Sequence, residues 1–179
     1  EKLQKVIGDN ISGKTSFEFT PGQVLALTGM QISGKDYGLD GALTVDGLTS
    51  GIVLSTAQLI ARHDDLSNLS ELAGRPLSGR AEADLAGYYQ VLTGAFDIEG
   101  RVTGTDLTVN EPRMDRLLAG QSTIDISAGR TEDGTELREL TVNAQRISLT
   151  GNGHLTGDNV DLTANFNMPT LADLDPAFE

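Results

Sequence analysis

The chain has 179 residues, of which 26 are acidic and 13 basic, and its formal net charge at pH 7 is -13. This charge excludes a general nucleic-acid binder, because nothing neutralises a phosphate backbone, and it disfavours electrostatic adhesion to an anionic membrane surface. Cysteine is absent, which excludes thiolate catalysis and cysteine metal sites. The 21 glycines follow no collagen-like period and only 5 prolines occur, so the composition indicates many turns rather than disorder.

The stretch "GDNISGKT", residues 8–15, matches the phosphate-binding loop pattern G-x-x-x-x-G-K-[ST]. Such a loop needs a helix directly after it, because the helix N-terminus helps to hold the phosphates. Here Phe17 and Phe19 alternate with polar residues, and the Pro-Gly pair 21–22 follows, which predicts a strand and a turn. We therefore interpret the motif as a glycine-bearing turn between two strands and expect no nucleotide binding.

Apolar residues alternate with polar ones along most of the chain, in runs that end at glycine-rich turns. This period of two predicts β-strands with one apolar and one polar face. The residues expected on the apolar face, which are also the candidate ligand-binding residues, are Phe17, Phe19, Leu25, Leu27, Leu39, Leu43, Val45, Ile52, Leu54, Leu92, Phe96, Ile98, Val102, Ile124, Ile126, Leu140, Val142, Ile147, Leu149, Val160, Leu162, Phe166 and Met168.

Helical patterns are short. "DDLSNLSELAG" (64–74) and "NEPRMDRLLAG" (110–120) both space apolar residues for one helical face and both end in Leu-Ala-Gly. The final glycine of each is typical of a helix C-terminus. "TLADLDPAF" (170–178) begins a third such element. We expect one continuous β-rich fragment of a longer repeat protein, with approximate units 1–63, 64–111 and 112–170, and with 171–179 starting the next unit.

The predicted fold class is all-β: an elongated, curved antiparallel sheet that forms an open, taco-like trough with an apolar concave face, plus two or three short helical turns. The alternation by itself leaves a second arrangement open. The same apolar side chains could face one another in a closed sandwich or barrel core.

Catalytic and metal-binding patterns are weak. His63 and His154 are the only histidines, and neither has a second histidine at ligand spacing. Because Asp64 and Asp65 follow His63 at the start of a predicted helix, we interpret this cluster as a helix cap. The segment 151–159, "GNGHLTGDN", lacks the order of a calcium-binding nonapeptide and predicts a tight turn. We expect no enzyme, no catalytic residue, no cofactor and no metal.

Four motifs carry a resemblance to a known family: "LAGRPLSG" (72–79), "RMDRLLAG" (113–120), "GTELRELTVNAQRISLTGNGHL" (134–155) and "LADLDP" (171–176). Together they resemble the TamB proteins of Gram-negative bacteria, the inner-membrane component of the translocation and assembly module, over about residues 52–179. The neighbouring AsmA-like proteins show a similar pattern of Leu, Gly and Asp.

The resemblance implies a periplasmic β-groove that conducts phospholipid between the inner and outer membranes, or supports outer-membrane protein assembly, or both. It also implies an inner-membrane anchor and a TamA-like outer-membrane barrel as partner of the full-length protein. No apolar run approaches the roughly 18 residues of a membrane-spanning helix, so the anchor is expected outside this fragment. The alternative function is a structural β-rich module, such as an adhesin or autotransporter passenger segment with a closed core.

Overall fold

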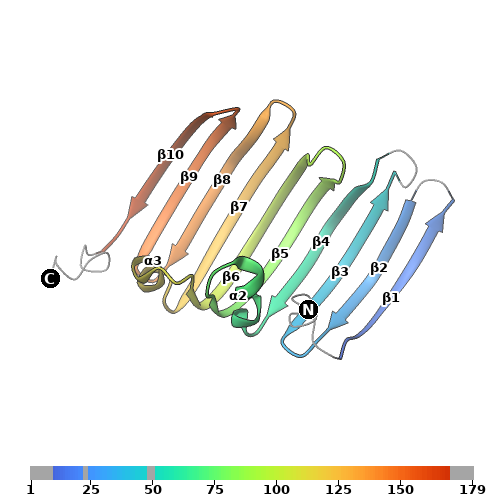
Figure 1. Cartoon of the computed structure of the whole chain (residues 1–179), viewed down its shortest axis with the longest axis horizontal. Helices are drawn as coiled ribbons and strands as arrows, with labels where there is room; N and C mark the ends of the chain where they lie inside the picture. The colour runs from blue at the N-terminus through green and yellow to red at the C-terminus, as the bar shows by residue number, and fades with distance from the viewer. Residues whose placement is uncertain (1–9, 22–23, 48–50, 170–179) are drawn as a thin grey trace.

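The computed structural model describes residues 10–21, 24–47 and 51–169 as one ten-stranded antiparallel sheet (Figure 1). The strands lie side by side in chain order, and β1 and β10 are the two edges, so the sheet is open and does not curl back on itself. The predicted all-β fold with an open antiparallel sheet is confirmed. The strands are β1 (Ser12–Thr20), β2 (Val24–Ser33), β3 (Tyr37–Asp46), β4 (Val53–His63), β5 (Ser78–Gln90), β6 (Phe96–Thr108), β7 (Gln121–Thr131), β8 (Gly134–Ala144), β9 (Ile147–Thr156) and β10 (Asn159–Asn167).

The strand register aligns residues of one face into rows that cross the sheet. We name each row by its residue on β7. The Ile124 row crosses all ten strands and contains Gly13, Ile32, Leu39, Ala61, Ala83, Val102, Ile124, Val142, Leu149 and Phe166. The Ile126 row beside it contains Met30, Gly41, Leu59, Leu85, Gly100, Ile126, Leu140, Gly151 and Ala164.

Three further rows complete this apolar face. The Ala128 row contains Thr56, Gly87, Ile98, Ala128, Leu137, Gly153 and Leu162. At the corresponding level of β1 to β3, Phe17 pairs with Leu27, and Leu27 pairs with Leu43. The Arg130 row contains Phe19, Leu25, Val45, Leu54, Tyr89, Phe96, Arg130, Thr135, Leu155 and Val160. The Ser122 row contains Tyr37, His63, Ala81, Gly104, Ser122, Ala144 and Ile147.

Glycines in these rows make room for leucines of neighbouring strands. A Cβ atom at Gly100 would lie 2.5 Å from Leu85 Cδ2, and one at Gly153 would collide with the side chain of Leu162. Each leucine therefore leans over the glycine beside it. The leucine then covers backbone that would otherwise be bare, and the apolar surface stays continuous from strand to strand.

The opposite face of the sheet is polar and carries cross-strand ion pairs. Arg101 Nε donates to Asp125 Oδ1 at 2.5 Å, and Arg62 Nη2 donates to Asp40 Oδ2 at 2.5 Å. Gln58 donates to Asp84 at 3.0 Å in the same layer. Each of these exposed pairs contributes little to the free energy of folding. Their charged and polar groups make this face of the sheet hydrophilic.

Bulges keep the apolar residues on one face where the sequence slips out of phase. In β2 the register shifts between Leu27 and Met30, and Gly29 there has a φ of 57°. Similar shifts occur in β4 before Leu59 and in β8 after Leu137. An extra residue at each bulge reverses the alternation, so the following apolar residue returns to the same side.

The two predicted helical elements are present at one end of the strands, called here the helix end (Figure 1). The first comprises η1 (Leu66–Leu69) and α2 (Ser70–Ala73) and ends at Gly74, whose φ is 69°. The second is α3 (Pro112–Leu117), which begins with Pro112 as expected. Glu111 caps α3 by accepting from the backbone N–H groups of Arg113 and Met114, both at 3.0 Å. The third expected element, from residue 170, lies outside the described residues.

One predicted turn is wrong, and another is shorter than the segment in which it was expected. Gly13, Lys14 and Thr15 of the "GDNISGKT" motif lie within β1, with a bulge before Ser16, because this segment pairs with the end of β2. "GNGHLTGDN" is mostly strand as well, since β9 continues to Thr156 and β10 begins at Asn159. The turn is confined to the two residues between these strands.

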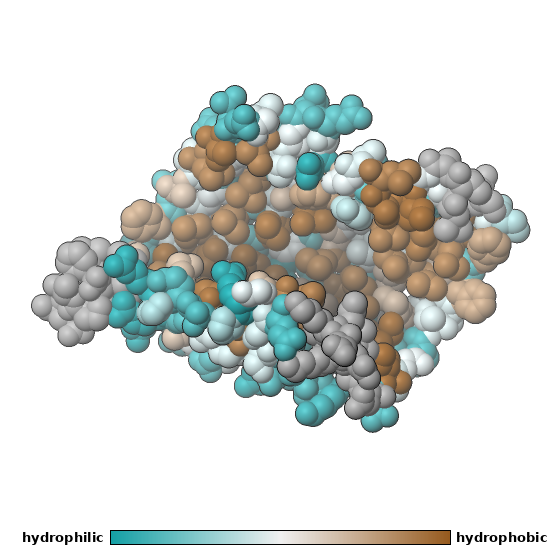
Figure 2. Space-filling view, in the orientation of Figure 1, coloured by the Kyte–Doolittle hydropathy of each residue, from teal (hydrophilic) through white to brown (hydrophobic). Residues whose placement is uncertain are grey.

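The apolar face has no second layer over it among the described residues. Few apolar side chains of the described residues are buried: Met30 and Ala128 on the face, and Leu117 and Leu118 at the end of α3, are 3–9% exposed, and none of the large side chains described is fully buried. Figure 2 shows apolar residues covering the middle of this face, which is hollowed between polar borders at the two ends of the strands. The described part of the molecule is therefore a single sheet with an accessible apolar side.

Candidate ligand-binding face

The candidate residues that fall within strands gather on the apolar face. They extend from Phe17 and Phe19 on β1 to Val160, Leu162 and Phe166 on β10, and they occupy the rows defined above. Met168 follows the end of β10. Because the strands lie in chain order, Phe17 and Phe166 are on the two opposite edge strands, and the candidate residues extend across the whole sheet.

Besides Met168, two candidates lie outside the strands. Leu92 is in the turn between β5 and β6 and is 79% exposed, so its predicted place in phase with Phe96 is wrong. The physical reason is the Thr-Gly pair that follows it, which closes a turn through the Gly94 N–H and the Gln90 carbonyl at 2.9 Å. Ile52 precedes β4, and its carbonyl accepts from the Val91 N–H at 2.9 Å.

Sequence reasoning missed several residues of the face. Met30, Leu59 and Leu137 stand beside bulges, so strict alternation placed them out of phase. Ile32 and Leu85 were detectable, since each has an alternating apolar partner within its own strand. The glycine positions of the face carry no useful hydropathy signal.

Two apolar hollows mark the face. The larger has a volume of about 350 Å³ and lies towards the helix end, where Leu69 of η1 meets Leu39, Ala61 and Ala83. The smaller, of about 170 Å³, is lined by side chains that include Leu59, Leu85 and Tyr89. At the same helix end, Leu117 and Leu118 at the end of α3 are buried. The helices thus border the face at one end of the strands.

His63 lies at this border rather than in a helix cap. Its Nδ1 accepts from the Asp65 N–H at 3.3 Å, and its ring stacks on Tyr37 with centroids 6.4 Å apart. Asp65 is the capping residue, because its Oδ1 accepts from the Ser67 N–H at 3.0 Å. Hydrogen bonds from the side chain and the backbone N–H of Ser67 lower the pKa of the Asp65 carboxyl below its usual value. The interpretation of the His-Asp-Asp cluster as a helix cap therefore holds for Asp65.

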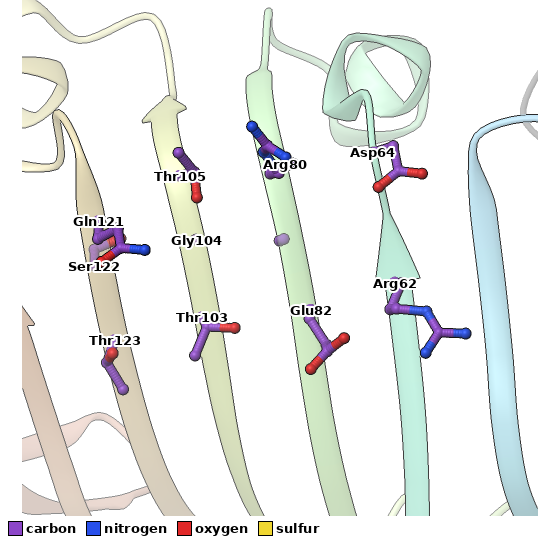
Figure 3. Close-up of a pocket in the computed structure, with 11 residues that line it drawn as sticks. Arg62, Asp64, Arg80, Glu82, Thr103, Gly104, Thr105, Gln121, Ser122 and Thr123 are labelled. Carbon is purple, nitrogen blue, oxygen red and sulfur yellow. The ribbon is translucent and has the colours of Figure 1, made fainter.

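The polar face carries a shallow pocket of about 300 Å³ near the helix end (Figure 3). Charged side chains of its lining, among them Arg80 and Glu82, come from the side of β4 and β5, and hydroxyl side chains, among them Thr103, come from β6 and β7. Arg62 at its border is already paired with Asp40. Within the described ranges, no group of three or more His, Asp or Glu side chains is placed to hold a metal ion.

None of the helices in the described segments is both long and apolar enough to span a membrane. Comparison with protein-family models, with curated proteins and with solved structures gives no match.

Proposed function

We propose that this chain is a segment of a TamB-like periplasmic protein and that its apolar face conducts phospholipid between the inner and outer membranes or supports outer-membrane protein assembly. The observation that carries the proposal is the Ile124 row, in which apolar or small residues follow one another across all ten strands. The sequence resemblance adds the family and the compartment.

The exposure of the face favours a ligand over a structural core. Phe17, Leu162 and Phe166 are 73%, 64% and 66% exposed. Soluble proteins rarely leave a contiguous apolar surface of this kind in water unless another molecule covers it. Lipid tails are suitable occupants, because they gain from leaving water and need no specific polar partner.

The two open edges of the sheet support a role within a longer protein. β1 and β10 each have one side without a strand partner among the described residues. Free edges template pairing with further strands, so a longer chain can extend the same apolar rows. In the full-length protein we place an inner-membrane anchor at one end of this path and a TamA-like barrel at the other.

The proposal is tested by photo-crosslinking in cells that express the full-length protein. A photo-reactive amino acid at position 166, on the apolar face of β10, should capture phospholipid. The same amino acid at position 165, which pairs with Thr150 on the polar face, is the matched control. A second pair is Val102 and Thr103 in the middle of the sheet. Capture at all four positions or at none contradicts the proposal and favours the structural β-rich module.

A further inference from the structure

Arg130 is the only Lys, Arg, Asp or Glu among the described strand residues of the five apolar rows. β7 pairs with β6 without a register shift, so its alternation from Ile124 and Ile126 continues to Arg130. The residue stands opposite Phe96 on β6 and Thr135 on β8. Its side chain therefore lies on the apolar side of the sheet, at the end of the strands away from the helices, called here the turn end (Figure 1).

The guanidinium of Arg130 has no protein partner among the described residues. The arginines at positions 62, 101 and 138 each pair with an aspartate on the polar face. Arg130 makes no hydrogen bond or ion pair with Glu132 or Asp133, the acidic residues of the following turn. In a chain with a net charge of -13, an exposed unpaired cation beside an apolar surface is complementary to an anionic group on an apolar molecule.

The surroundings of Arg130 suit the boundary between the head and the tails of a lipid. In the same row, Phe96 lies beside Arg130 on β6 and Tyr89 lies one strand further on β5. Thr135 lies on its other side, on β8, and adds a hydroxyl. The tyrosine and arginine side chains each combine an apolar body with a polar group, which favours them where hydrocarbon meets water. The next rows towards the helix end contain no charged residue.

The length of β7 also matches the length of phospholipid tails. Arg130 lies eight positions along β7 from Ser122 at the helix end, which corresponds to roughly 27 Å of extended strand. The tails of one bilayer leaflet occupy about 15 Å, half of the roughly 30 Å hydrocarbon core. Tails that lie along β7 from Arg130 therefore end before the buried residues of α3.

We propose that Arg130 binds the phosphate of an anionic phospholipid whose tails lie on the Ala128, Ile126 and Ile124 rows. This inference rests on the proposed function, and it adds the orientation of the bound lipid. The head groups lie at the turn end and the tails point towards the helix end. A guanidinium matches a phosphate with parallel N–H donors, and such charge-assisted hydrogen bonds are among the stronger ones in proteins.

The test uses the wild-type chain and two variants that each lose one positive charge, Arg130→Gln and Lys14→Gln. Lys14 is the control, because it pairs with Gln31 on the polar face and has no ion pair among the described residues. The probes are monomeric dioctanoyl phosphatidylglycerol, dioctanoylglycerol, which lacks the phosphate, and inorganic phosphate. Binding is followed by the NMR shifts of backbone amides, so one titration reports both affinity and location.

Arg130→Gln should weaken phosphatidylglycerol binding roughly tenfold and leave dioctanoylglycerol binding unchanged. Lys14→Gln should change neither by more than about twofold, because an exposed charge on the other face is screened. Inorganic phosphate alone should not bind measurably. Equal effects of the two variants on phosphatidylglycerol, or no effect of Arg130→Gln, would overturn the assignment of Arg130. Failure of the wild type to bind either lipid would overturn the proposed function itself.

Discussion

Arg138 on β8 and Asp97 on β6 bind each other across the strand between them. Arg138 Nη1 donates to Asp97 Oδ2 at 2.9 Å and Nη2 donates to Oδ1 at 2.6 Å, and the pair passes over Gly129 of β7. A Cβ atom at position 129 would lie 2.9 Å from Arg138 Nη1. The absent side chain of Gly129 therefore permits an ion pair that ties together three strands on the polar face.

This ion pair makes stability depend on pH in the acidic range. The hydrogen bonds from Arg138 hold the pKa of Asp97 below its ordinary value of 3.8. A carboxyl whose pKa is lower in the folded state stabilises the fold above the unfolded pKa, and this contribution is lost as pH falls through the folded pKa. The free energies of unfolding of the wild type and of Arg138→Gln should therefore differ at pH 6 and converge below the folded pKa of Asp97.

Carboxyl NMR titration gives the direct check. The pKa of Asp97 should rise in Arg138→Gln and stay unchanged in Arg130→Gln, which removes the same charge from the other face. An unchanged Asp97 pKa in Arg138→Gln would show that the pair does not persist in solution.

The glycine that follows α3 should tolerate substitution less well than the one that follows α2. Gly74 and Gly120 have φ values of 69° and 80°, a region that costs residues with a Cβ roughly 1–2 kcal/mol. Space surrounds Gly74, whereas a Cβ at Gly120 would lie 2.6 Å from Gln145 Nε2. Gly120→Ala should therefore lower the melting temperature further than Gly74→Ala. Equal shifts would mean that Gln145 moves aside without loss.

Acidic substitutions should distinguish the open face from its few buried positions. Phe166 is 66% exposed, so Phe166→Asp keeps its carboxylate in water and should cost about 1 kcal/mol or less. Ala128 is 7% exposed between Ile98 and Leu137, so Ala128→Asp should cost several kcal/mol. Urea unfolding measures both. A loss at Phe166 as large as that at Ala128 would indicate a closed core.

The "GDNISGKT" motif should not bind nucleotide. Lys14 is a strand residue that pairs with Gln31 of β2, and β1 continues through Phe19 to Thr20, where a phosphate loop would lead into a helix. Lys14→Ala should leave stability nearly unchanged, and titration with ATP or GTP plus magnesium should give no saturable signal. Saturable binding that disappears in Lys14→Ala would contradict this.

Period-two patterning predicted the strands wherever no bulge interrupts them. β10 is the clearest case, since Val160, Leu162, Ala164 and Phe166 share one face as the alternation indicates. The alternation left an open trough and a closed core as alternatives, and the family resemblance favoured the open, single-layer arrangement. Alternation reports that one face of a strand is apolar, but it carries no information on whether another layer covers that face.

Other features have no local signal in the sequence. The bulge before Leu59 reverses the phase within β4, although no glycine or proline lies within this strand. Arg130 looks like an ordinary solvent-facing residue beside a turn, and only the register with Phe96 places it on the apolar face. The prediction for Leu92 was wrong for the opposite reason. Leu92 is an apolar residue in a turn, and its hydropathy resembled that of the first residue of a strand.

The accessibility of the apolar face, and its occupation by lipid, can be measured most directly by cysteine labelling, because the chain contains no cysteine of its own. Neighbouring positions on opposite faces form matched pairs: Ile126→Cys with Ser127→Cys on β7, and Leu162→Cys with Thr163→Cys on β10. Maleimide reaction rates are compared with and without dioctanoyl phosphatidylglycerol. All four cysteines should react without lipid, and lipid should slow the reaction at positions 126 and 162 alone. Unreactive cysteines at 126 and 162 without lipid, or equal protection on both faces, would contradict an open lipid-binding face.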